Sequence, residues 1–134
     1  MNSESTFSKK VKFSAGEVII KEGDDGGPFY ILLEGKCEVL KRDFPMTTLA
    51  KNGIIFGEMS MLLDIPRTAT VKAVSDVEAI EVNISLDDMF KHYPKTTKSM
   101  MRTLAKRVVH QTDVLYGYIV EEELLEYGSL DMEE

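Results

Sequence analysis

The residues best suited to do chemistry lie between positions 56 and 71, in the segment FGEMSMLLDIPRTATV. Gly57 lets the backbone approach a ligand closely, and the apolar turn over 59–63 predicts a short helix whose first N–H groups favour an anion. Arg67 follows about two helical turns later, at the start of an expected strand, where its guanidinium can hold a phosphate through paired N–H bonds. Glu58 would be repelled by that phosphate, so we expect it to accept a hydrogen bond from a sugar hydroxyl. Together these residues indicate a nucleotide ligand.

Short strands separated by turns must position this segment. Over residues 11–83, turn signals rich in glycine, asparagine and aspartate recur about every eight to twelve residues. Strands this short bury their apolar faces only by stacking or closing on themselves, so a sandwich or barrel is expected. The candidate strands are 11–13, 18–21, 29–34, 37–42, 47–50, 67–74 and 79–83.

The rest of the chain predicts helices. Ser85 and Asp88 have the spacing of a capping box, which opens a short helix that stops at Pro94. A longer helix is expected over about 96–118, because apolar residues recur there on one face. A polar gap at Gln111 and Thr112 interrupts that apolar face. The apolar positions are Met101, Leu104, Val108, Leu115 and Ile119.

Charge divides the chain in two. Its 134 residues suit one domain, and the formal net charge of −7 disfavours nucleic acid as a partner. Residues 121–134 hold seven acids and no Lys or Arg, so residues 1–120 balance at 16 acids and 16 bases. We therefore expect a domain over 1–120, with a barrel at about 11–83 and helices at about 85–120, followed by an acidic tail over 121–134. A basic run over 95–107 is a candidate contact for that tail.

Several classes of protein are disfavoured. The single cysteine, Cys37, cannot form an internal disulfide and suits a small core position. Apolar runs are too short for a membrane span, and the first ten residues lack a signal-peptide core, so we expect a cytoplasmic protein without membrane insertion. His92 and His110 lack partners at metal-ligand spacing, so neither a metal site nor an enzyme is expected.

The segment over 56–71 resembles the phosphate-binding cassette of the cyclic-nucleotide-binding domain family, shared by kinase regulatory subunits, gated channels and catabolite-activator-type regulators. The match has no gap, and the resemblance covers roughly residues 11–115. It implies an eight-stranded jelly-roll β barrel, mainly β with C-terminal helices (α+β), with a short cassette helix and a long C-terminal helix. Its supporting features are Gly16-Glu17, Glu22-Gly23-Asp24 and Phe29-Tyr30-Ile31 followed by Gly35.

The resemblance also implies roles for individual residues, with cAMP or cGMP as the ligand and no cofactor. Arg67 pairs with the cyclic phosphate, and Glu58 accepts the ribose 2′-OH. Ser60 replaces the family's common alanine, and its hydroxyl can add a bond. A threonine at position 68 accompanies both guanine and adenine in relatives, so the base stays open. The implied ligand-binding set is Phe56, Gly57, Glu58, Met59, Ser60, Arg67, Thr68 and Ala69, with Gln111 and Thr112 as base contacts or as a solvated helix face.

The expected function is therefore that of a regulatory sensor, in which the bound nucleotide moves the C-terminal helix over the base. Expected partners are the nucleotide, an effector protein and a second copy of the chain, paired through that helix. Two alternatives remain open. The barrel is degenerate and serves protein interaction or dimerisation, or the chain is a fragment of a larger regulator.

Overall fold

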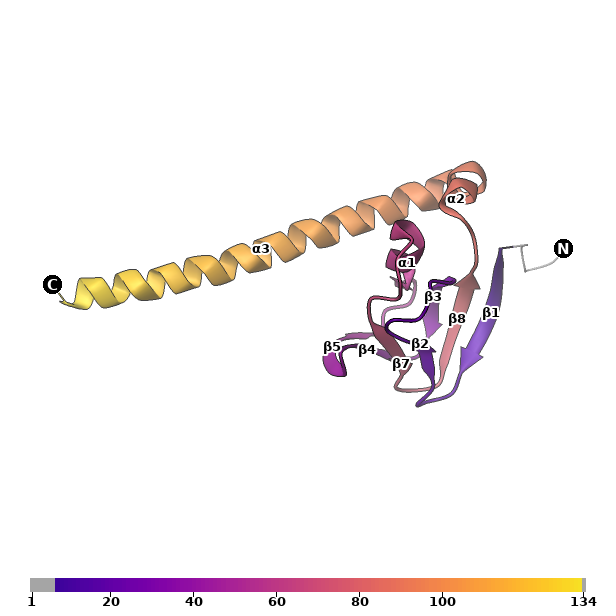
Figure 1. Ribbon diagram of the computed structural model, residues 1–134, viewed down its shortest axis with the longest axis horizontal. Helices are drawn as coiled ribbons and strands as arrows, with labels where there is room; N and C mark the ends of the chain where they lie inside the picture. The colour runs from indigo at the N-terminus through magenta and orange to yellow at the C-terminus, as the bar shows by residue number, and fades with distance from the viewer. Residues whose placement is uncertain (1–6, 134) are drawn as a thin grey trace. The chain divides into compact units, whose positions relative to one another are not determined.

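The computed structural model describes residues 7–133, and the chain divides into two units, residues 1–88 and 89–134. Figure 1 shows the strands of the first unit and the long helix of the second. Within the described residues the elements are β1 (Ser8–Phe13), β2 (Val18–Ile20), β3 (Phe29–Glu34), β4 (Cys37–Lys41), β5 (Phe44–Leu49), β6 (Ile55–Phe56), α1 (Glu58–Leu63), β7 (Thr70–Ala73), β8 (Val77–Val82), α2 (Leu86–His92) and α3 (Pro94–Glu133).

The strands form two antiparallel sheets that enclose the core of the first unit. Their orders are β1-β8-β3-β6 and β2-β7-β4-β5. Both sheets contribute buried residues to one apolar cluster, such as Leu32 and Ala79 from the first and Cys37 and Val71 from the second. Burial also raises the pKa of the Cys37 thiol. The prediction of a mainly β jelly-roll fold with a long C-terminal helix is confirmed.

Aromatic packing holds the segment that leads into α1. The Phe56 ring, at the end of β6, stacks on Tyr30 of β3 with centroids 5.3 Å apart. Phe13 of β1 meets the same tyrosine edge-on at 6.0 Å. Because Phe56 immediately precedes Gly57 and α1, this burial fixes where the short helix begins.

The hairpin between β4 and β5 differs from the prediction. Its two central residues, Arg42 and Asp43, have φ of 50° and 65°, the left-handed backbone that a two-residue hairpin of this kind needs. β5 then begins at Phe44 instead of residue 47 and contains Pro45. The proline is tolerated because β5 is the outermost strand of its sheet and the ladder with β4 is irregular there.

Other boundaries also differ. The strand expected over 67–74 begins at Thr70, so Arg67 lies in the connection between α1 and β7. The two-residue strand β6 was not predicted. α2 ends before Pro94 as expected, and its cap is confirmed because the Asp88 N–H donates to Ser85 Oγ at 3.1 Å.

The long helix differs at its C-terminal end. α3 begins at Pro94, where proline suits the first turn of a helix. Its backbone stays helical through Glu133, well past the expected end near residue 118. The division into a domain over 1–120 and a tail over 121–134 stays a prediction. No helix within residues 7–133 combines the length and apolar composition needed to cross a membrane.

Candidate functional site

The candidate site is built around the guanidinium of Arg67, a side chain whose residue is only 8% exposed. Its Nη1 donates to the Gly57 carbonyl oxygen and to Ser60 Oγ, both at 2.9 Å. Its Nη2 donates to the Pro28 carbonyl oxygen at 2.6 Å. These acceptors lie in the loop before β3, at the start of α1 and within α1. The guanidinium therefore joins the connection between α1 and β7, which carries it, to α1 and to the loop before β3.

All three acceptors of Arg67 are neutral. Among the side chains described over residues 7–122, no carboxylate forms an ion pair with Arg67. Burial lowers the pKa of Arg67, and the charges of Tyr30 and Asp24 partly oppose that shift. The three bonds use three of the five N–H donors of a guanidinium, which leaves Nε–H and one Nη2 N–H. A buried cation with free donors and no carboxylate partner is suited to bind an anion.

Two glycines let the backbone wrap this side chain. Gly57 has a φ of 82°, and a Cβ there would lie 2.6 Å from Ile20 Cδ1 and 3.1 Å from Arg67 Nη1. A Cβ at Gly27 would lie 3.2 Å from Arg67 Nη2. Any larger residue at either position would push into the guanidinium or the core beside it.

The backbone of Arg67 is also fixed. Its N–H donates to the Asp24 carbonyl at 2.8 Å, and its carbonyl accepts the Gly23 N–H at 2.9 Å. One residue earlier, the Glu22 N–H donates to Thr70 Oγ1 at 3.0 Å. The loop after β2 therefore lies beside the segment that carries Arg67, and it holds the guanidinium at a defined position.

The structure brings part of the predicted binding set together. Gly57, Ser60 and Arg67 are joined by hydrogen bonds, and Glu58, only 3% exposed, is the first residue of α1. The others lie along the same segment with different exposure. Phe56 is buried, Ala69 is half-buried, and Met59 and Thr68 are exposed.

The two predicted base contacts lie in the other unit. Gln111 and Thr112 are exposed neighbours on α3, and Thr112 Oγ1 donates to the Val108 carbonyl at 2.9 Å. Their contact with a base stays a prediction.

Sequence reasoning missed two contributors to this site. One is the Pro28 carbonyl, which accepts a hydrogen bond from Arg67. The other is Lys41, whose Nζ donates to the Thr68 carbonyl at 2.6 Å. The glycine pair before Pro28 was a signal for a loop, but no residue type marks a backbone acceptor. Lys41 precedes Thr68 by 27 residues, and only the pairing of β4 with β7 brings them together.

A pocket of about 650 Å³ lies beside α1, and Ser60 is the predicted site residue that lines it. Asp25, Asp64 and Asp88 also line this pocket. In the part of the chain that the structure describes, no group of three or more His, Cys, Asp or Glu side chains is placed to hold a metal ion.

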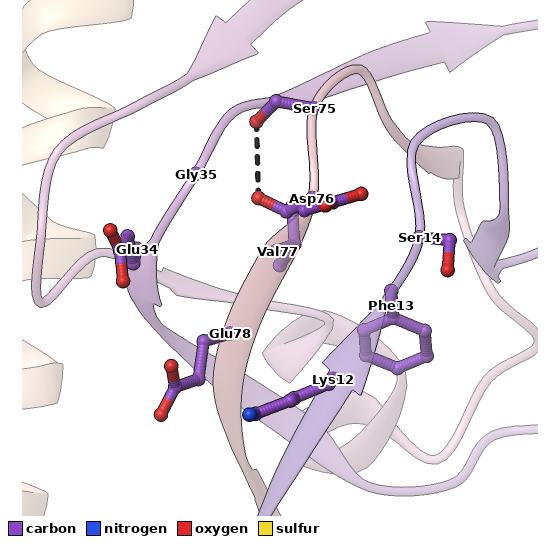
Figure 2. A pocket seen from close by; sticks show the side chains of 9 residues that line it. All are labelled: Lys12, Phe13, Ser14, Glu34, Gly35, Ser75, Asp76, Val77 and Glu78. Atoms are coloured by element: carbon purple, nitrogen blue, oxygen red, sulfur yellow. Dashed lines mark hydrogen bonds between the residues drawn. The ribbon is translucent and has the colours of Figure 1, made fainter.

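A second pocket of about 650 Å³ lies between the ends of β1 and β3 and the start of β8 (Figure 2). The side chains of Glu34, Glu78 and Lys12 border it. Gly35 lies in the turn after β3 that borders this pocket. It has a φ of 100°, and a Cβ at this position would collide with the Asp76 carbonyl oxygen, so only glycine fits here. None of the predicted binding residues lines this pocket. Its lining combines exposed, half-buried and buried residues and is mixed in charge, unlike the buried cation of the Arg67 site.

Comparison with known proteins finds relatives of similar sequence and fold. Residues 10–92 match the family model described as "Cyclic nucleotide-binding domain". A cAMP-dependent protein kinase regulatory subunit from Emericella nidulans is 38% identical over 94 residues, 69% of this chain and 22% of the relative. A cGMP-dependent protein kinase from Plasmodium berghei is 40% identical over 73 residues, 54% of this chain and 8% of the relative.

A solved structure described as "Sp-2Cl-cAMPS bound to PKAR CBD2" has a TM-score of 0.63 and 30% identity to this chain. The alignment covers 81% of this chain and 69% of that one. The chain thus spans most of that structure but only 22% and 8% of the two curated relatives.

Proposed function

This chain belongs to the cyclic nucleotide-binding domain family, and on that premise we propose that it binds a cyclic nucleotide, cAMP or cGMP, as a regulatory module. One observation carries the proposal. Arg67 is buried, its acceptors are neutral, and two of its N–H donors remain for an anion. A cyclic phosphate supplies the single negative charge and the paired oxygens that such a guanidinium fits.

In this proposal the ligand lies along the segment from Phe56 to Ala69. Arg67 pairs with the cyclic phosphate, and the backbone amides at Gly57, Ser60 and Thr68 approach the phosphate or the ribose. Glu58 accepts the ribose 2′-OH, which gives this buried carboxylate a neutral donor away from the phosphate. Phe56 and Met59 complete the surface against which the nucleotide packs, and Ala69 borders the phosphate.

One alternative is weaker. A degenerate barrel that only binds proteins has no use for the two N–H donors that remain on the buried Arg67 guanidinium, because burying a cation is costly unless it is paired. We propose that the module is not itself catalytic, and that ligand binding acts on an effector protein or on a larger chain that contains this module. The matched regulatory subunit is a relative of that kind by its description.

Isothermal titration calorimetry of the purified chain with cAMP and with cGMP tests the proposal. We expect at least one of them to bind with a dissociation constant of about micromolar or tighter. The matched control ligand is 5′-AMP, which keeps the base and ribose but carries an open phosphate of higher charge, and it should bind more weakly. Absence of heat with both cyclic nucleotides at millimolar concentration would contradict the proposal.

We further propose that α3 transmits the binding event. Gln111 and Thr112 would contact the base, while exposed apolar residues spaced by seven, Met101, Val108 and Leu115, would pair with a second copy. Hydrogen exchange and light scattering with and without cyclic nucleotide test both parts. We expect slower exchange around residues 108–115 on binding and a mass of two chains. Unchanged exchange contradicts the movement, and a single-chain mass contradicts the dimer.

A further inference from the structure

The last residue of β4 contacts the segment that follows Arg67. Lys41 Nζ donates to the Thr68 carbonyl oxygen at 2.6 Å, and it also lies 3.4 Å from Glu22 Oε2. The ammonium is therefore shared between a backbone carbonyl and a carboxylate. Both partners lie far from Lys41 in the sequence, at positions 22 and 68.

Glu22 holds the lysine in place through further contacts. Its Oε1 accepts the Arg42 N–H at 2.8 Å, and its own N–H donates to Thr70 Oγ1 at 3.0 Å. The pKa of the Glu22 carboxyl is lowered, first by the hydrogen bond from Arg42 and also by the charge of Lys41. Glu22 thus joins the β4–β5 hairpin to the first residue of β7.

The turn of this hairpin has a backbone conformation that residues other than glycine rarely adopt. Arg42 and Asp43 both have positive φ, and for arginine this left-handed conformation is sterically disfavoured. The bond from the Arg42 N–H to Glu22 helps to keep this turn formed. Lys41 is therefore presented from a turn of fixed shape and not from a free loop.

The contact with Thr68 has a direct consequence for the next residue. The Thr68 carbonyl and the Ala69 N–H belong to one planar trans peptide unit and point in opposite directions. A cation bonded to the carbonyl fixes the orientation of that N–H and polarises it, so the N–H becomes a stronger donor. Within the described residues no protein group accepts a hydrogen bond from the Ala69 N–H.

We propose that Lys41, held by Glu22, is a positioning residue for the ligand: it aims and strengthens the Ala69 N–H toward the cyclic phosphate. This role rests on the proposed function, because the phosphate is the acceptor for that N–H. Lys41 itself does not touch the ligand and acts through the peptide unit that it bonds.

The test compares three variants of the full chain. Lys41→Met removes the donor, Lys41→Arg keeps a cationic donor, and Lys10→Met is the matched control, because it removes an exposed lysine that pairs with Glu78 at 3.0 Å on another strand. We expect Lys41→Met to weaken cyclic nucleotide binding about fivefold, Lys41→Arg to restore most of it, and Lys10→Met to bind like the wild type.

A second measurement needs no ligand. In the free protein, the NMR signal of the Ala69 amide proton should move toward lower frequency in Lys41→Met, because the peptide loses its polarising cation, and should stay unchanged in Lys10→Met. The proposal would be overturned if the Ala69 amide signal did not move in Lys41→Met. It would also be overturned if Lys41→Met bound the nucleotide as tightly as Lys10→Met does. If the wild-type chain binds neither cAMP nor cGMP, the proposed function fails and this role fails with it. The amide signal then still reports whether the lysine contact exists.

Discussion

Replacing Arg67 with alanine is expected to weaken cyclic nucleotide binding by about a hundredfold or more, because it removes the buried cation that faces the phosphate. Two N–H donors are available to the ligand, and both disappear with the side chain. Calorimetry of wild type and variant with the same nucleotide measures the change. If Arg67→Ala binds within about threefold of the wild type, the phosphate is bound elsewhere.

The change also removes internal bonds, so folding must be followed separately. Arg67→Ala leaves the acceptors at Gly57, Ser60 and Pro28 without their donor, and a lower melting temperature is expected. The matched variant is Arg67→Lys, which keeps the charge but cannot form the planar fork of parallel N–H bonds. We expect its affinity to fall between the other two. A folded Arg67→Ala that does not bind separates the loss of ligand contact from a loss of structure.

Glu58→Gln is expected to weaken binding of the natural nucleotide by about tenfold or more, because a charged acceptor for the ribose 2′-OH becomes neutral. The shape of the side chain is nearly unchanged, which suits a residue that is only 3% exposed. The same variant should bind the 2′-deoxy analogue as the wild type binds it, since that analogue has no hydroxyl to donate.

This comparison is a thermodynamic cycle that measures the coupling between the Glu58 carboxylate and the ribose 2′-OH. Wild type against Glu58→Gln, each with the ribose and the 2′-deoxy nucleotide, gives four affinities by calorimetry. A loss of equal size for both nucleotides would show that Glu58 supports the fold of α1 and does not contact the hydroxyl. Losses that are not additive would assign the hydroxyl contact to this residue.

The elements with strong local signals were predicted well. β3 has the predicted bounds because a run of apolar residues lies between Pro28 and Gly35, both of which interrupt strands. Ser85 caps α2 as predicted, because the motif needs only residues close in sequence. Strand β6, with two residues, is too short for any alternation of apolar and polar side chains to show.

The site could be predicted in part for a related reason. The segment around Gly57, Ser60 and Arg67 is continuous, so its residue types and spacing indicate one place in the fold. The acceptor at Pro28 and the donor at Lys41 reach the site through strand pairing, and neither differs in type from many other carbonyls or lysines. The placement of Arg67 in a strand was wrong because its backbone pairs with the loop at Gly23 and Asp24 and not with a neighbouring strand.

Pro45 has a consequence for how this protein behaves when it is concentrated. It lies in β5, the outermost strand of its sheet, where exposed Phe44 and Met46 flank it. Growth of cross-β fibrils requires a strand whose amides can pair in an unbroken row with those of another molecule. Pro45 has no backbone N–H, so the row of amide donors along β5 is interrupted. The apolar edge formed by β5 is therefore a poor template for fibril growth.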